Sequence, residues 1–266
     1  MNDKNIYLYK YLREMPLYLA MVRSMECSLY KENAQLKKPV LDLGCGDGFF
    51  AATAFKESLS AGIDPDTKTI HKGIKYKSHD HLIASEGSHL PFKDESFNTV
   101  ISNSVFEHIE KVNNTLKEVS RILKPEEYFY FTVPSEYFGE MLLGSTFFRI
   151  LRLNGLSKMY ANWFNGHSKH YHTDPPNIWI ERLNKYGFQV KTWTYYFPPS
   201  SHRIFDLMHY LSLPRLITKK LFGKWVIFPD FFINKFLDNY LQPYIKDSPL
   251  DKGAYIFFTA RKVSSK

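Results

Sequence analysis

The sequence of 266 residues contains only two cysteines, Cys27 and Cys45. Two thiols are too few to staple a chain of this length with disulfides, so we expect a reducing, cytoplasmic environment. The first residues lack the charged and then apolar regions of a secretory signal. The longest apolar runs, such as WVIFPDFFINKFL, are interrupted by Pro229, Asp230 and Lys235. They therefore fall short of the roughly 18 uninterrupted apolar residues that a membrane-spanning helix needs.

Negative charge is scarce relative to positive charge, and the formal net charge is +8. A positive surface suits anionic partners such as acidic lipid headgroups or a phosphorylated substrate, although a solvated basic surface is the commoner explanation. No basic run is joined to a nucleic-acid-binding motif, so a nucleic-acid partner stays a minor alternative. The hydrophobic content of 44% argues against general disorder.

The order of the elements predicts an α/β fold. Residues 1–36 read as helices broken at Pro16, and short apolar segments then alternate with amphipathic ones. A helix is expected around the stretch NNTLKEVSRILKP, with Val112, Leu116, Val119 and Leu123 on one face and its end before Pro125. A later helix is expected to begin with Asp174 as its N-cap. Strands that alternate with helices indicate βαβ units and a mostly parallel sheet. The expected strands are 38–44, 58–64, 81–85, 97–103, 128–134, 188–197 and 253–262.

The stretch VLDLGCGDGFF carries the clearest functional signal. A buried strand runs into Gly44-Cys45-Gly46-Asp47-Gly48 and then into a helix, and glycines there allow a ligand to approach the backbone closely. Asp64 ends the next strand, where a carboxylate can accept hydrogen bonds from two ribose hydroxyls. This pairing suits a dinucleotide or another adenosine cofactor.

Three details favour the second kind of cofactor. The loop reads G-x-G-x-G and not the G-x-G-x-x-G that seats a pyrophosphate. The acidic Asp42 just before it suits a ligand with an ammonium or sulfonium group. Glu86 stands where an adenine amino group could donate a hydrogen bond. A nicotinamide-dependent dehydrogenase therefore remains the weaker alternative.

With its LDLGCGDG loop, acidic residue after the second strand, LPF and SFN segments, and EHI stretch, the chain resembles class I S-adenosylmethionine-dependent methyltransferases. The likeness is strong over residues 38–134. It implies a Rossmann-like seven-stranded sheet in the order 3-2-1-4-5-7-6 with the last strand antiparallel. It also implies S-adenosylmethionine as cofactor and S-adenosylhomocysteine as product. SFN and the Pro125-Glu126-Glu127 turn depart from the usual SFD and PGG.

The resemblance also implies the cofactor-binding residues, and it suggests small-residue packing for Cys45. Arg23 could meet the cofactor carboxylate, but an ordinary ion pair with Glu26 is the favoured interpretation. The expected cofactor-binding residues are Asp42, Gly44, Cys45, Gly46, Gly48, Asp64, Glu86, Gly87 and Asn103.

The segment NGHSKHYHTDPP places His167, His170 and His172 within six positions. They could form a metal site, but their spacing matches no standard zinc pattern and Asp174 is the only carboxylate nearby, so we predict no metal. They could equally be a solvated loop. The favoured interpretation is an acceptor site in which imidazole removes the proton from a hydroxyl, with His170 or His172 as the base. In the resembling family His108 would lie near the cofactor.

The expected organisation is an N-terminal helical cap, 1–36, and a methyltransferase domain, 37–266, with two insertions. Insertion 135–172 is expected to be a lid on the acceptor pocket. Insertion 198–252 is aromatic, basic and helical, and it is expected to be a lid, a dimer contact or a peripheral membrane surface. We therefore predict methyl transfer, in the form of O-methylation, to a small-molecule, sugar or lipid-linked acceptor with an anionic part. A methyltransferase-like binding protein without turnover is the alternative.

Overall fold

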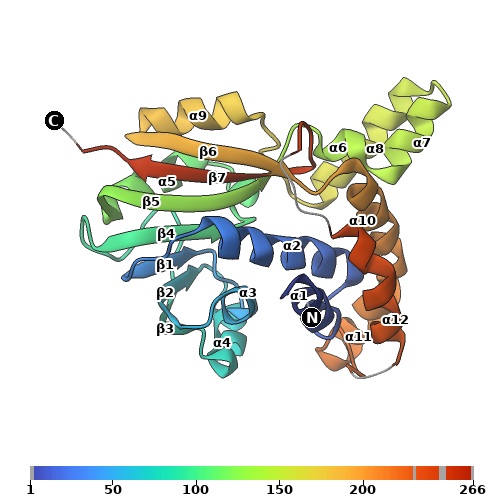
Figure 1. Ribbon diagram of the computed structural model, residues 1–266, viewed down its shortest axis with the longest axis horizontal. Helices are drawn as coiled ribbons and strands as arrows, with labels where there is room; N and C mark the ends of the chain where they lie inside the picture. Colours follow the sequence, from blue (N-terminus) through green and yellow to red (C-terminus); the bar gives the residue numbers. More distant parts are fainter. Residues whose placement is uncertain (1–2, 230–231, 246–249, 265–266) are drawn as a thin grey trace. The chain divides into compact units, whose positions relative to one another are not determined.

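The computed structural model describes residues 3–229, 232–245 and 250–264 (Figure 1). The chain forms two compact units, each assembled from segments that are far apart in sequence. Unit 1 comprises residues 1–29, 137–168 and 195–255, and unit 2 comprises residues 30–136, 169–194 and 256–266. The expected division into a cap and a domain with two insertions stays a prediction. Most residues of the expected cap, 1–36, and of the two expected insertions, 135–172 and 198–252, belong to unit 1.

A seven-stranded sheet has the order β3-β2-β1-β4-β5-β7-β6, which confirms the predicted order. The four pairs β1–β2, β1–β4, β2–β3 and β4–β5 are parallel. The strands are β1 Val40–Leu43, β2 Leu59–Asp64, β3 His79–Ala84, β4 Phe97–Asn103, β5 Leu123–Pro134, β6 Phe188–Tyr196 and β7 Tyr255–Lys262.

The last strand is antiparallel to its neighbour, as predicted. The N–H of Ala254 donates to the carbonyl of Phe197 at 3.0 Å, so the start of β7 lies beside the end of β6. At the other end, the N–H of Val263 donates to the carbonyl of Gly187 at 2.8 Å. The sheet is therefore mixed, and the carboxyl ends of its parallel strands share one edge, where α/β folds bind their ligands.

Helices between the strands bury an apolar face because their apolar residues recur every three or four positions. In α5, Val112, Leu116 and Val119 are buried as expected. Leu123, expected on the same face, instead begins β5, because the helix ends at Ile122. The helices of unit 2 are α3 Phe49–Ala54, α4 Thr67–Gly73, α5 Val112–Ile122 and α9 Pro176–Lys185, with the 3-10 turns η1 Ile74–Tyr76 and η2 Phe106–His108.

The expected N-cap of the helix after the histidine segment is wrong. Helix α9 begins at Pro176, and the flanking residue is Pro175. Asp174 instead accepts a hydrogen bond at 2.6 Å from Nη1 of Arg182, which is a residue of α9 itself. The two prolines preset the extended backbone and the first helical residue without a side-chain cap. Trp179 of this helix is fully buried against Phe106 and Phe131.

Unit 1 is almost entirely helical and is held by an aromatic core. Phe138 contacts the rings of Phe164, Phe205 and Tyr255. The side chain of His202 is buried, and its Nε2 lies 2.9 Å from the carbonyl oxygen of Phe138. The helices are α1 Asp3–Leu12, α2 Leu17–Asn33, α6 Phe138–Met141, α7 Leu143–Ile150, α8 Asn154–His167, α10 Pro199–Leu211, α11 Leu213–Phe222 and α12 Phe232–Leu241, with the 3-10 turn η3 Gln242–Tyr244; the last residues of α2 continue into unit 2. Within the described ranges, no helix combines the length and the apolar character needed to cross a bilayer.

Candidate cofactor and acceptor site

The glycine loop leaves the carboxyl end of β1 with the backbone geometry that only glycine adopts readily. Gly44, Gly46 and Gly48 have φ values of +77°, +55° and +71°. The N–H groups of Gly44 and Cys45 both donate to the carbonyl of Ile63 in β2, at 2.8 and 2.9 Å. The loop is therefore fastened to the neighbouring strand at the ligand-binding edge of the sheet.

Asp64 ends β2 and faces the same loop. Its Oδ2 accepts from the N–H of Gly46 at 3.1 Å, and its Oδ1 accepts from the N–H of Asp66 at 2.9 Å. Because each carboxylate oxygen has a second lone pair, the group can still accept hydrogen bonds from two hydroxyls. The ribose role that the sequence predicts for Asp64 stays a prediction.

The glycine loop borders open space at one of its three glycines. A Cβ built at Gly46 meets no atom within 4 Å, so this part of the backbone borders open space. Gly44 and Gly48 differ, because a Cβ would lie 2.4 Å from Cγ2 of Val105 and 2.4 Å from Oγ of Ser78, respectively. Gly46 is thus the position where a ligand can approach the main chain, and Gly44 and Gly48 keep the loop packed on its support.

Asp42 has a partner that the sequence did not reveal. Its Oδ2 lies 3.0 Å from Nε2 of His79, both side chains are buried, and Nδ1 of His79 lies 3.0 Å from Oγ of Ser78. His79 can reach Asp42 because β2 has Gly62 between them: a Cβ there would lie 2.8 Å from Cδ2 of His79. A glycine inside a strand was the one available signal of this close approach. The buried contact with His79 holds the Asp42 side chain next to the start of the loop. A contact between Asp42 and a cofactor stays a prediction.

The remaining predicted cofactor residues have different surroundings. Burial and the nearby carboxylates of Asp42 and Asp64 raise the pKa of the Cys45 thiol, which is consistent with a packing role. Asn103 is buried at the end of β4, and its Oδ1 accepts from Oγ1 of Thr132 at 3.0 Å. Glu86 is exposed. A Cβ at Gly87 would lie 2.9 Å from Cγ2 of Thr115. The adenine-binding roles of Glu86 and Gly87 stay predictions.

The three histidines of the opening segment do not share one set of partners. His167 ends α8 in unit 1, where its ring stacks on Trp163 with centroids 5.7 Å apart. His172 belongs to unit 2: its Nε2 contacts the carbonyl of Ile109 at 3.0 Å, and its Nδ1 lies 3.5 Å from Oδ2 of Asp174. These contacts give His167 and His172 packing and anchoring positions.

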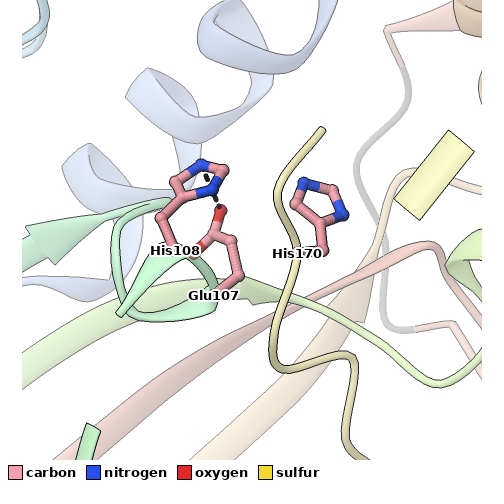
Figure 2. Close-up of side chains that lie close together, drawn as sticks. All are labelled: Glu107, His108 and His170. Atoms are coloured by element: carbon pink, nitrogen blue, oxygen red, sulfur yellow. Dashed lines mark ion pairs between the residues drawn. The ribbon is translucent and has the colours of Figure 1, made fainter. Parts of the chain in front are cut away.

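His170 instead lies beside His108 and Glu107, which follow β4 (Figure 2). The two imidazole centroids are 5.4 Å apart, and Nε2 of His108 is 3.8 Å from Oε1 of Glu107. The ligand atoms offered by the three side chains all lie within 4.8 Å of one another. We call this group the Glu107–His108–His170 cluster. Within the described residues it is the only such group of three or more His, Cys, Asp or Glu side chains.

The local electrostatics change the expectation for His170. Burial, reinforced by His108, lowers the pKa of His170 to about 3. The imidazole of His170 therefore binds a proton weakly and is neutral at neutral pH. A base that titrates near the ordinary imidazole pKa of about 6.5 therefore does not describe His170 in this setting.

Arg23 and Glu26 form the ordinary ion pair that the sequence favoured. Nη1 of Arg23 lies 2.6 Å from Oε2 of Glu26, one helical turn away in α2. The hydroxyl of Tyr196 donates to Oε1 of the same carboxylate at 3.0 Å. All three residues belong to unit 1, and these contacts give the buried carboxylate a structural role.

Comparison with known sequences supports the interpretation of the loop. Residues 41–131 match the family described as a methyltransferase domain. An uncharacterized methyltransferase, YodH, from Bacillus subtilis is 36% identical over 93 residues, which cover 33% of this chain and 40% of that protein. An uncharacterized methyltransferase from Mycobacterium sp. (strain JLS) is 32% identical over 89 residues. The chain spans only 35% of the length of this second relative.

Solved structures show the same fold at low sequence identity. A possible histamine N-methyltransferase from Thermotoga maritima superposes with a TM-score of 0.59 at 16% identity, over 92% of each chain. Geranyl diphosphate C-methyltransferase from Streptomyces coelicolor gives 0.57 at 13% identity, over 90% of this chain and 79% of that one. The family match and the glycine loop identify a methyltransferase domain over residues 41–131, and the solved structures show that the chain has the fold of S-adenosylmethionine-dependent methyltransferases. S-adenosylmethionine is its cofactor, as the sequence predicted.

Replacing Asp64 with alanine should weaken binding of S-adenosylhomocysteine by about 1.5–3 kcal/mol, because a charged acceptor of hydrogen bonds is lost. Titration calorimetry measures this directly. Asp80→Ala is the matched control, since it removes an exposed carboxylate from the adjacent strand β3. Equal affinities of the two folded variants would remove Asp64 from the cofactor site.

Proposed function

We propose that the chain transfers a methyl group to a hydroxyl of an apolar, lipid-linked acceptor at a membrane surface. The observation that carries this proposal is a set of exposed apolar helix faces in unit 1. Helix α11 contains Leu213, Leu216, Ile217 and Leu221 at i, i+3, i+4 and i+8, yet none of its described residues is buried. An apolar helix face that the described residues leave exposed indicates a partner.

Two further helices of the same unit expose apolar stripes. In α7, Leu143, Phe147 and Ile150 recur at i, i+4 and i+7, and all three are exposed. In α8, Leu156, Met159 and Trp163 recur at i, i+3 and i+7, and all three are exposed as well. Helices α7 and α8 lie in the segment expected to contact the acceptor. Their exposed apolar side chains suit an acceptor that carries a hydrocarbon chain.

Charge selects an anionic membrane as the partner. Lys220 and Lys224 are exposed at and just beyond the end of α11, and Lys219 lies over the ring of Trp225 at 5.5 Å. Apolar residues interleaved with lysine are typical of helices that lie in the interface of an anionic bilayer. The net charge of +8 has the same sign. The proposed location is therefore cytoplasmic with peripheral attachment to the membrane.

Chemistry at the acceptor is proposed to take place at the Glu107–His108–His170 cluster. S-adenosylmethionine supplies a methyl group that is already activated on a sulfonium, so alignment and proton removal are left to the chain. Nδ1 of His108 donates to the carbonyl of Lys169 at 3.1 Å, which leaves the lone pair on Nε2. That nitrogen lies on the side of Glu107, whose carboxylate would stabilise a protonated imidazole. The cluster can thus accept the proton of a hydroxyl.

Of the three histidines predicted to be catalytic, we propose a role in the reaction for His170. Its ring would orient the acceptor hydroxyl toward His108. His172 is proposed to act only through the backbone it anchors. Among the described residues, His167 contacts the rings of Trp163 and His209 in unit 1, and we propose no chemical role for it. Incubation with methyl-labelled S-adenosylmethionine and a lipid extract should label a lipid product. Label found only in water-soluble products would contradict the lipid acceptor.

Membrane attachment predicts that the protein sediments with phosphatidylglycerol vesicles at low salt and is released at high salt. Ile217→Glu should weaken this binding by about tenfold or more, because an apolar side chain leaves the interface and a like charge enters it. Ile74→Glu is the matched control: both isoleucines are 60% exposed, but Ile74 lies in unit 2. Equal sedimentation of both variants would contradict attachment through α11.

A further inference from the structure

We propose that the Glu107–His108–His170 cluster is a binding site for one divalent transition-metal ion. The three side chains offer two imidazole nitrogens and one carboxylate oxygen, all within 4.8 Å of one another. Two histidines and one carboxylate are a ligand set that zinc, iron and manganese ions share in proteins. Three protein ligands leave at least one coordination position for water or for an acceptor oxygen.

Two chain segments far apart in sequence are fastened together at this place. The N–H of Tyr171 donates to the carbonyl of Glu107 at 2.7 Å. Nδ1 of His108 donates to the carbonyl of Lys169 at 3.1 Å, and Nε2 of His172 contacts the carbonyl of Ile109 at 3.0 Å. These three contacts flank His170 on both sides. One main-chain hydrogen bond and two histidine contacts together therefore set its position next to Glu107 and His108.

The hydrogen bond to Lys169 also selects the tautomer of His108. A carbonyl can only accept, so Nδ1 carries the hydrogen and Nε2 presents its lone pair beside Oε1 of Glu107. Metal-binding histidines are commonly oriented by such a contact from the second ring nitrogen to a carbonyl. The same contact that suits His108 to accept a proton thus also suits it to bind an ion.

Burial and charge of the cluster agree with a cation site. Glu107 is 2% exposed, His108 is exposed and His170 is half-buried. The carboxylate supplies negative charge in a buried place, and the exposed ring of His108 leaves a route for an ion to enter. Tetrahedral zinc would hold its ligand atoms about 3.3 Å apart, so the three ligand atoms, which lie within 4.8 Å of one another, would move closer together when an ion binds.

A metal ion at this place would change how the acceptor hydroxyl is activated. This part of the inference rests on the proposed function: an ion that binds the hydroxyl oxygen lowers its pKa, and the proton then leaves to solvent instead of to His108. The methyl group forms its new bond to that oxygen as its bond to sulfur breaks, which leaves a neutral thioether. The presence of the ion itself requires no acceptor and can be tested alone.

The test is equilibrium binding of Zn²⁺ to the metal-free protein, with Co²⁺ as a spectroscopic probe of nitrogen and oxygen ligands. We expect one tight equivalent, and a loss of affinity on the order of 100-fold in each of Glu107→Gln, His108→Ala and His170→Ala. His71→Ala removes an exposed histidine of α4 and serves as the control for adventitious surface binding. S-adenosylhomocysteine binding and the melting temperature show that each variant is folded.

The outcomes separate this inference from the proposed function. Zinc that binds equally to all five proteins, or to none, overturns the metal site even if methyl transfer proceeds. Loss of the tight equivalent in the three cluster variants, with His71→Ala unchanged, supports the site even if the acceptor proves not to be a lipid. In the active enzyme, a chelator that removes the ion and stops turnover, with recovery on adding Zn²⁺, would support its role in catalysis.

Discussion

Replacing Gly46 with valine should weaken binding of S-adenosylhomocysteine by at least about 100-fold. Gly46 has a φ of +55°, and a Cβ there points into space that no protein atom fills within 4 Å. A branched side chain would occupy the space that a cofactor needs and would disfavour the backbone conformation that brings its N–H to Asp64. Calorimetric titration with S-adenosylhomocysteine gives the affinity of each variant.

Gly187→Val separates loss of ligand space from backbone strain. Gly187 also has a positive φ, +77°, and its Cβ would likewise meet nothing within 4 Å, but it follows α9 at a distance in sequence from the loop. Both substitutions impose a strained backbone of about 1–3 kcal/mol. We expect Gly187→Val to be less stable yet to bind S-adenosylhomocysteine as the parent does. Equal loss of affinity in both variants would indicate that strain, and not ligand space, explains the effect.

Removing either imidazole of the cluster should slow methyl transfer by about 10²–10⁴-fold in a single turnover, with little change in cofactor affinity. Because His108 and His170 are proposed to act together on one hydroxyl, the double variant should be scarcely slower than the slower of the two single variants. A single-turnover measurement is required because slow product release can hide a slower chemical step.

His71→Ala is the control for this second prediction as well, because it removes an exposed imidazole with no contact to the cluster among its described partners. His172→Ala should have an intermediate effect, since it removes an anchor of the segment and no group of the cluster. Parental rates in both His108→Ala and His170→Ala would move the acceptor chemistry away from this cluster.

Much of the sheet could be predicted because its strands are short apolar runs bounded by glycine, proline and turn residues. The order of the strands came from the resemblance to a family, since local sequence carries no information on which strands pair. The errors lie at element boundaries. Leu123 fits the apolar period of α5 and the start of β5 equally well. Asp174 has a side chain suited to capping α9, but in the structure its carboxylate binds Arg182 instead. A pattern of local residues does not show which of these two partners is preferred.

The candidate sites divide in the same way. The glycine loop and Asp64 are local signals, and the structure places them together. His79 beneath Asp42 could not be expected, because the contact crosses a strand and depends on the absence of a side chain at Gly62. The histidine segment was misleading for the same reason: proximity in sequence grouped His167, His170 and His172, whereas folding gave His170 different neighbours.

The unit that contains the exposed helices was also hidden from sequence. The N-terminal helices, α6–α8 and α10–α12 come from three separated stretches, yet they form one compact unit. Apolar residues of α11 look like core residues in sequence because the period of an exposed apolar face equals that of a buried one. Only the burial of each residue shows that Leu216 and Ile217 face away from the protein.

The central claim is that this chain binds S-adenosylmethionine through the glycine loop and Asp64. The most direct measurement is calorimetric titration of the purified protein with S-adenosylhomocysteine, S-adenosylmethionine and NAD, each repeated with Asp64→Ala. We predict one-to-one binding of the first two, weaker binding of both by Asp64→Ala, and no binding of NAD. Binding of NAD without S-adenosylhomocysteine, or affinities that Asp64→Ala leaves unchanged, would contradict the account.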